Sequence, residues 1–250
     1  MRPFQIILFL LLFFSCKQNT QTQLTKITAR TIAVDSTIAF SKPIDSIIAP
    51  YKQQLEANMK QELCYAPIDF TKNDGILQST LGNLVADLCF EMANSIYEEK
   101  TDNSIDFVLF NHGGLRASIP KGIVTRESAF NLMPFENDLV VARIKGKKVV
   151  EMVNYFIKNQ RAHPLSYNIN LTLTANDFSL KINGEIFNPT RTYAVLTNDF
   201  LQNGGDKMDF FAQPETLTDL NYKVRDAIID YFKKTDTLQP SLDNRVINKL

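Results

Sequence analysis

The stretch TNDFLQNGGD (Thr197–Asp206) follows a short apolar run, and the stretch NHGGLR (Asn111–Arg116) follows another. Four of the nine glycines in the 250-residue chain stand in these two stretches, as two adjacent pairs. Glycine lets the backbone approach a ligand closely and take positive φ. In open α/β sheets, ligands bind where strands end. Two ordinary tight turns would also explain the pairs, but two similar pairs with polar neighbours favour a shared ligand site.

Aromatic and charged residues accompany both glycine pairs. Phe135 lies between the pairs in the stretch MPFEN (Met133–Asn137), and Phe200 lies just before the second pair. Two rings from two loops would sandwich a planar base. Asp206 would accept hydrogen bonds from sugar hydroxyls, and the planar fork of Arg116 would bind an anionic group. The alternative is that each ring belongs to the core.

The hydrophobic pattern predicts a mixed α/β (α+β) fold. Short apolar or alternating runs predict strands at residues 27–34, 105–110, 139–144, 167–173, 178–182 and 193–197. Apolar residues three and four apart predict helices at residues 48–59, 81–96, 149–157 and 220–231. Pro50 is expected in the first turn of its helix, where proline is tolerated. Thr125 is expected to cap a short helix that reaches Leu132, and Asn183-Gly184 predicts a hairpin turn.

The first residues have the pattern of a secretion signal and not of a part of the folded domain. Met1–Pro3 carries a positive charge, Phe4–Phe14 is apolar, and Ser15-Cys16 follows at once. Residues 1–16 therefore resemble a bacterial lipoprotein signal peptide in which Cys16 becomes the lipidated first residue. An ordinary signal peptide with an incidental cysteine is the alternative. We expect a polar tether at 17–26, one domain at 27–250, and a lipid anchor in the bacterial envelope, on the periplasmic side or the outer surface.

Composition narrows the choice of ligands. Lysine plus arginine and aspartate plus glutamate number 27 each, and no basic run occurs, so binding of a nucleic-acid polymer through charge is not expected. No cysteine spacing indicates a zinc site. Cys89 lies on an apolar helical face and is expected to be a buried free thiol. A disulfide with Cys64 is the alternative in an oxidising compartment.

Five motifs together resemble the C-terminal domain of the 5′-nucleotidase family, in that family's order and at about its spacing. They are LGNLVADL (81–88), NHGGLRASIPKGIVT (111–125), MPFEN, TNDFLQNGGD and DNRV (243–246), and the resemblance covers about residues 27–246. It implies a layered α-β domain that supplies the nucleotide-binding half of a phosphoesterase site. The substrate-binding residues it implies are Asn111, Gly113, Gly114, Arg116, Phe135, Asn137, Phe200, Gly205 and Asp206.

The resemblance also implies a role for several of these side chains. Phe135 and Phe200 correspond to the pair that stacks the base, and Asp206 corresponds to the ligand of the ribose hydroxyls. Arg116 corresponds to an arginine that contacts phosphate, and Asn137 to an amide that contacts the base.

The chain departs from the family pattern at four places. His112 stands where the family has glycine, and residues 72–77 lack the arginines that often precede the LGN motif. The loop 160–165 lacks a glycine, and Lys207-Met208 replaces a Gly-Tyr pair. These departures leave the phosphate contacts and the identity of the ligand open.

The family's chemistry is two-metal hydrolysis of phosphate esters, and its metal ligands sit in a separate N-terminal domain. This chain has two histidines, His112 and His163, which we expect in surface or loop positions without a metal role. No catalytic residue, metal or cofactor is therefore assigned to this chain, and divalent metals are expected on a separate metallophosphatase chain.

Three functional hypotheses follow from these motifs. The first is a nucleotide-binding chain that completes the active site of that metallophosphatase partner. The second is a non-catalytic lipoprotein that binds nucleosides or related ligands. The third is a structural lipoprotein with a decayed pocket. The presence of Phe135, Phe200 and Asp206 favours the first two.

Overall fold

The computed structural model of the chain describes residues 24, 26–174 and 177–249. Its internal contacts divide the chain into two units, residues 1–47 and 48–250. The predicted signal peptide and Cys16 lie outside the described residues. None of the helices in the described ranges is long and apolar enough to cross a lipid bilayer.

The predicted first strand at 27–34 is wrong. These residues have no regular secondary structure, and no described strand pairs with them. The apolar side chains of Ile27, Ile32 and Val34 are 80%, 74% and 89% exposed. An alternating pattern forms a strand only when a neighbouring strand takes up its backbone hydrogen bonds and one of its faces is buried.

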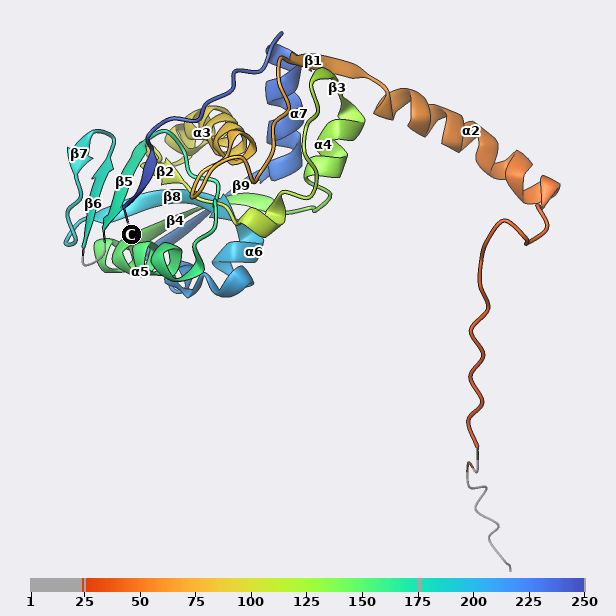
Figure 1. The fold of residues 1–250 in the computed structure, drawn as a ribbon, viewed down its shortest axis with the longest axis horizontal. Coiled ribbons are helices and arrows are strands. Elements are labelled where there is room, and N and C mark those ends of the chain that lie inside the picture. The colour runs from red at the N-terminus through yellow and green to blue at the C-terminus, as the bar shows by residue number, and fades with distance from the viewer. Residues whose placement is uncertain (1–23, 25, 175–176, 250) are drawn as a thin grey trace, which may run out of the picture. The chain divides into compact units, whose positions relative to one another are not determined.

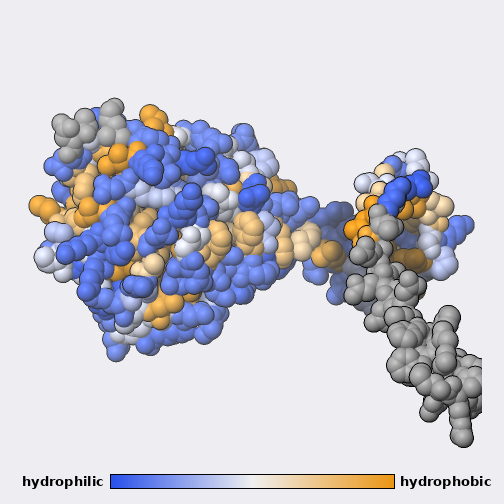
Figure 2. All heavy atoms as spheres, turned by 90° about the horizontal axis from the view of Figure 1, so that it is seen from below, coloured by the Kyte–Doolittle hydropathy of each residue, from blue (hydrophilic) through white to orange (hydrophobic). Residues whose placement is uncertain are grey.

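Helix α2 spans Lys42–Met59, and none of its residues is buried. Pro50 lies in the middle of α2, so the expectation that it stands in the first turn is wrong. Its missing N–H removes one backbone hydrogen bond from a helix that is exposed to water. The predicted stripe of Ile48, Tyr51 and Leu55 is present and exposed. Exposed apolar side chains of this kind appear as orange patches among hydrophilic ones in Figure 2.

A mixed four-stranded sheet lies at the centre of the second unit, in the order β2-β8-β4-β9. Strand β2 runs parallel to β8, and β4 runs antiparallel to both β8 and β9. The bounds are β2 Phe107–Val108, β4 Asp138–Lys145, β8 Thr192–Asn198 and β9 Thr216–Lys223. Helices α3 (Thr80–Thr101) and α7 (Val224–Lys234) cover one face, and α5 (Gly146–Asn159) covers the other (Figure 1). This layered arrangement confirms the predicted α/β fold.

Two further sheets flank this centre. One has the order β10-β5-β6-β7, and the other pairs β1 with β3. Their bounds are β1 Glu62–Ala66, β3 Gly122–Thr125, β5 Ile169–Thr174, β6 Phe178–Ile182, β7 Glu185–Ile186 and β10 Val246–Lys249. The predicted hairpin turn is confirmed, because Asn183 and Gly184 both take positive φ, at 53° and 79°. The predicted cap is confirmed as well, since Thr125 precedes helix α4 (Arg126–Leu132).

Several boundaries differ from the predicted ones. The predicted strand at 105–110 is buried as expected, but only Phe107–Val108 pair as a strand. The last helix begins at Val224, because Leu220 belongs to strand β9, which pairs with β4. Strands β1, β3, β9 and β10 were not predicted. Strands β1, β3 and β10 are too short to show a clear period, whereas the eight-residue β9 lacks a strict alternation of apolar and polar residues.

A buried ion network explains two of the motifs structurally. Arg245, of the DNRV motif, is 1% exposed, and its Nη2 lies 2.8 Å from Asp87 Oδ2 and 2.7 Å from Asp243 Oδ2. Its Nη1 also donates to the carbonyl of Leu165 at 2.7 Å. Asp87 belongs to the LGNLVADL motif on α3, so Arg245 ties the C-terminal segment to that helix and to the loop before β5.

Both described cysteines are free. Cys89 is buried on α3, which confirms the buried thiol, and no disulfide joins it to Cys64. Partial burial raises the pKa of the Cys64 thiol to about 11.

Candidate functional site

The sheet topology brings the three motif loops to one edge. Because β2 and β8 are parallel, their carboxyl ends meet at the same edge of the sheet. Asn111 follows β2, and Phe200 follows β8. Strand β4 is antiparallel to β8 and pairs Leu139 with Asn198, so its amino end, preceded by Asn137, reaches this edge too. The expectation that both glycine pairs come after buried strands is confirmed, and the two strands end at the same edge of the sheet.

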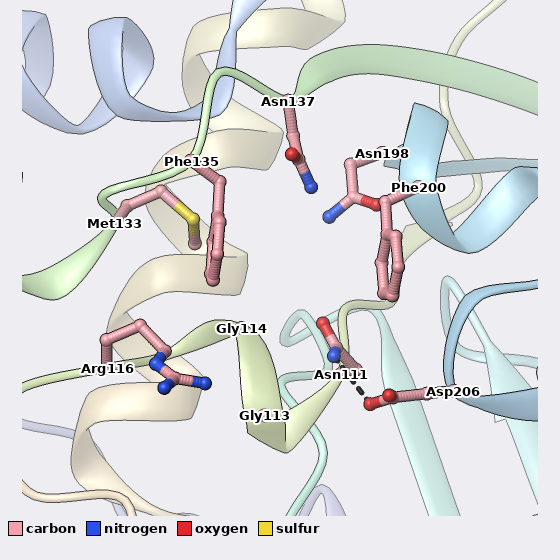
Figure 3. Close-up of a pocket in the computed structure, with 10 residues that line it drawn as sticks. All are labelled: Asn111, Gly113, Gly114, Arg116, Met133, Phe135, Asn137, Asn198, Phe200 and Asp206. Atoms are coloured by element: carbon pink, nitrogen blue, oxygen red, sulfur yellow. Dashed lines mark hydrogen bonds between the residues drawn. The ribbon is translucent and has the colours of Figure 1, made fainter. Parts of the chain in front are cut away.

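A pocket opens between these loops (Figure 3). It is lined by Asn111, Gly113, Gly114, Arg116, Met133, Phe135, Asn137, Asn198, Phe200 and Asp206. Eight of the nine residues implied by the family resemblance therefore line one pocket, and the ninth, Gly205, lies directly behind Phe200. Met133 and Asn198 were missed. Asn198 had a sequence signal, since a polar residue that precedes a short helical turn is a natural cap.

Phe135 and Phe200 are not core residues. Their side chains are 39% and 48% exposed, and their rings face one another across the pocket (Figure 3). Large apolar surface left exposed in a polar-rimmed pocket marks a binding site more often than a packing error.

In each glycine pair, one glycine stands where a Cβ would clash with a neighbouring side chain. A Cβ on Gly205 would lie 2.4 Å from Cε1 of Phe200, so only glycine lets that ring lie flat on the loop. A Cβ on Gly114 would lie 2.7 Å from Oδ1 of Asn111. The two pairs therefore keep the loops thin beneath the side chains that face the pocket.

Asp206 links the two glycine loops. Its Oδ2 accepts a hydrogen bond of 2.6 Å from Nδ2 of Asn111, and its backbone carbonyl accepts one of 3.0 Å from the Tyr155 hydroxyl. Its backbone is left-handed, with φ at 52°, a conformation that aspartate tolerates better than most residues. The side chain is exposed, so the carboxylate retains acceptor capacity for a ligand.

Arg225 of α7 holds the loop that carries Phe135. It is 6% exposed, and its Nη1 donates to the carbonyls of Met133 and Phe135 at 3.3 and 3.2 Å. It also pairs with Glu136, and its guanidinium lies 4.3 Å from the ring centroid of Phe130. The position of Phe135 thus depends on a buried cation from a distant part of the chain.

Positive charge gathers on the side of the pocket formed by Arg116. The Arg116 Cζ lies 5.8 Å from the Phe135 ring centroid, and the Lys72 Nζ donates to the carbonyl of Leu115 at 2.7 Å. Partial burial, and then the charges of Arg116 and Arg161, lower the pKa of Lys72. Lys72 and Arg161 come from two of the segments in which the chain departs from the family pattern. The structure places Lys72 beside Arg116, and Arg161 near enough to Lys72 for its charge to act on it.

The two histidines lie together, although the sequence puts them in unrelated segments. His163 Nδ1 accepts a hydrogen bond of 3.2 Å from the backbone N–H of His112, and His112 Nδ1 donates to the carbonyl of Ala162 at 3.2 Å. His163 lies in a loop, as expected, but it is buried and stacks on Phe156 and so does not have a surface position. Burial is the main cause that lowers its pKa to about 4. Within the described ranges, no three His, Cys, Asp or Glu residues are grouped closely enough to hold a metal ion.

The family model that describes the C-terminal domain of 5′-nucleotidase matches residues 58–213, more than half of the chain. The chain is also 30% identical, over 185 residues, to the trifunctional nucleotide phosphoesterase protein YfkN of Bacillus subtilis, covering 68% of this chain and 12% of that protein. It is 30% identical over 105 residues to protein UshA of Escherichia coli, covering 40% of this chain and 19% of UshA. The chain thus spans less than a fifth of the length of these relatives.

Solved structures show the same fold. The chain superimposes on a 5′-nucleotidase precursor from Thermus thermophilus with a TM-score of 0.68 and 24% identity, covering 82% of this chain and 43% of that one. It superimposes on the NAD nucleotidase of Haemophilus influenzae with a TM-score of 0.57 and 19% identity, covering 84% and 42% of the two chains. With the motif loops in one pocket and a family model matched across them, this chain belongs to the 5′-nucleotidase C-terminal domain family.

Proposed function

We propose that this chain binds a nucleoside or nucleotide and supplies the binding half of a phosphoesterase site. The observation that carries the proposal is the pair of exposed rings, Phe135 and Phe200, facing one another beside the carboxylate of Asp206. The base would stack between the rings, because stacking on aromatic side chains tolerates any base. The ribose hydroxyls would donate to the free oxygen of Asp206.

The charge around the pocket supports a ligand that carries phosphate. Arg116 is exposed and makes no ion pair with the described residues, and Lys72 and Arg161 lie near enough for their charges to act together. None of these three cations forms an ion pair with a carboxylate of a described residue, so an anion that binds beside them would relieve the repulsion between their charges. A planar guanidinium such as Arg116 suits a phosphate group well.

The catalytic half would come from a separate metallophosphatase chain that carries the divalent metals. This chain covers 43% of the Thermus thermophilus 5′-nucleotidase precursor, so more than half of that protein lies outside the matched part. In two-metal hydrolysis the metals activate the attacking oxygen and stabilise the leaving group, whereas the binding half orients the substrate. The two chains together would act in nucleotide catabolism in the bacterial envelope.

Asp206 gives the most direct test of the binding function. We expect Asp206→Ala to weaken binding of ribonucleosides about tenfold in calorimetry, because a charged acceptor of the sugar hydroxyls is lost. The free base should bind the variant as well as it binds the wild type. Asp206→Asn is the matched control for charge, since it keeps one acceptor oxygen. The proposal fails if no nucleoside, nucleotide or free base binds the wild-type protein.

A lipid anchor at Cys16 is the proposed means of holding the chain in the envelope. In a bacterial host, labelled fatty acid should enter the mature wild-type protein, and Cys16→Ala should abolish the label. Cys64→Ala, on the folded unit, should leave the label unchanged. A mature wild-type protein that begins elsewhere and carries no label would rule out the anchor.

A further inference from the structure

The side-chain amide of Asn198 has one end bonded and the other end open. Asn198 caps helix α6 (Asp199–Gln202), and its Oδ1 accepts a hydrogen bond of 2.9 Å from the backbone N–H of Leu201. The residue is 2% exposed, yet it lines the pocket. Figure 3 shows its nitrogen turned into the space between the two phenylalanine rings, toward Asn137.

The cap locks the direction of this amide. Turning the amide by half a rotation would place its NH₂ group against the N–H of Leu201 and lose the capping bond. The Nδ2 of Asn198 therefore faces the pocket as a hydrogen-bond donor. No described residue accepts from it.

Asn137 lies opposite and differs in this respect. Its side chain makes no hydrogen bond with the described residues, so its amide is free to present either its oxygen or its nitrogen. At one end of the aromatic pair the pocket thus has one fixed donor and one reversible amide. The Nδ2 of Asn198 faces the pocket, so a ligand that fills the pocket displaces water from this donor. The ligand is therefore expected to supply an acceptor in place of that water.

We infer that Asn198 is a specificity-determining residue that donates to an acceptor on the edge of the base, while Asn137 turns to meet the neighbouring group. This inference rests on the proposed nucleoside function. Base edges differ in the order of their donors and acceptors. The fixed donor requires a ring nitrogen or carbonyl opposite Asn198. The reversible amide of Asn137 can accept a hydrogen bond from an amine or donate one to a carbonyl at the neighbouring position of the base. Selectivity therefore lies at the base atom that faces Asn198 and not at the atom beside it.

Two substitutions separate this role from the capping role. Asn198→Ser and Asn198→Asp both keep an oxygen that caps the helix, so both variants should keep the fold, which circular dichroism would verify before binding is measured. Serine is too short to reach the base, and aspartate replaces the donor by a charged acceptor. We expect the tightest-binding nucleoside to lose about tenfold in affinity with Asn198→Ser and more with Asn198→Asp, whose carboxylate faces the lone pair of the base.

Ligand analogues identify the acceptor. Each analogue of that nucleoside would lack one edge acceptor, either as a deaza compound for a ring nitrogen or as a deoxo compound for a carbonyl. We expect one analogue to bind the wild-type protein about tenfold more weakly than the parent nucleoside does. The same analogue and the parent nucleoside should bind the Asn198→Ser variant with equal affinity. Asn137→Ser should not abolish this pairing between Asn198 and one ligand atom.

Equal losses for every analogue in the wild type and in Asn198→Ser would overturn the inference while leaving nucleoside binding intact. Failure of every nucleoside and nucleotide to bind the wild type would overturn both the inference and the proposed function. If Asp206→Ala left ribonucleoside affinity unchanged while one analogue still paired with Asn198, the base would be recognised as inferred and the sugar would be bound by other residues.

Discussion

Mixed with a metallophosphatase chain from the same organism, this protein is expected to raise hydrolysis of nucleoside monophosphates roughly a hundredfold or more above that chain alone. The gain arises because binding energy from the base and sugar, which do not react, holds the phosphate at the metals. Two stacked rings worth roughly 1–3 kcal/mol each supply enough binding energy for a factor of that size. The measurement is phosphate release from each chain alone and from the mixture, with divalent metal present.

Alone, this protein is expected to release no phosphate from nucleotides, even with divalent metal added. Its pocket offers amides, aromatic rings, one carboxylate and a guanidinium, whereas a metal-bound hydroxide needs several metal ligands together. Robust metal-dependent turnover by this chain alone would show that it has a catalytic site of its own. No change on mixing with the partner would favour the non-catalytic binding lipoprotein instead.

Two controls separate positioning from a general activation of the partner. A phosphate ester without a base should gain little from mixing, because it cannot use the aromatic pair. Arg116→Met should remove most of the gain on nucleotides, whereas Arg116→Lys keeps the charge and should retain part of it. If both variants matched the wild type, phosphate would not be held by Arg116.

The double variant Phe135→Ala, Phe200→Ala is expected to lose nucleoside affinity by a factor of between about thirty and twenty thousand, the sum of roughly 1–3 kcal/mol for each ring. Both side chains are partly exposed and outside the core, so the melting temperature should change little. Isothermal titration calorimetry on the wild type, both single variants and the double variant would measure how much each ring contributes to the binding free energy. Tyr51→Ala, which removes another exposed ring, on helix α2, should not alter binding.

Gly205→Ala tests the same aromatic pair without removing a ring. The new Cβ would lie 2.4 Å from Phe200, so the ring must leave its place on the loop. Affinity should therefore fall in this variant although both phenylalanines are present.

For the double variant Phe135→Ala, Phe200→Ala, an affinity equal to that of the wild type would contradict stacking as the source of binding.

Much of the site was predictable from sequence because its signals are local. Each signal can be recognised from a few neighbouring residues, without knowing what they contact in the fold. The signals are a glycine pair after a buried apolar run, an aromatic residue near it and a charged residue at its end. The pocket accordingly contains Arg116, Phe135, Asn137, Phe200 and Asp206 together. The family resemblance extended the same local motifs to their roles.

Only the tertiary structure decided features that depend on partners far away in the chain. The parallel pairing of β2 with β8, with β4 antiparallel beside them, is what gathers three loops at one edge. The exposed segment at 27–34 has the pattern of a strand, but no described strand pairs with it. His112 and His163 meet because two loops fold together, fifty-one positions apart. The direction of the Asn198 amide is set by its bond to the N–H of Leu201, a matter of side-chain geometry that composition and periodicity do not carry.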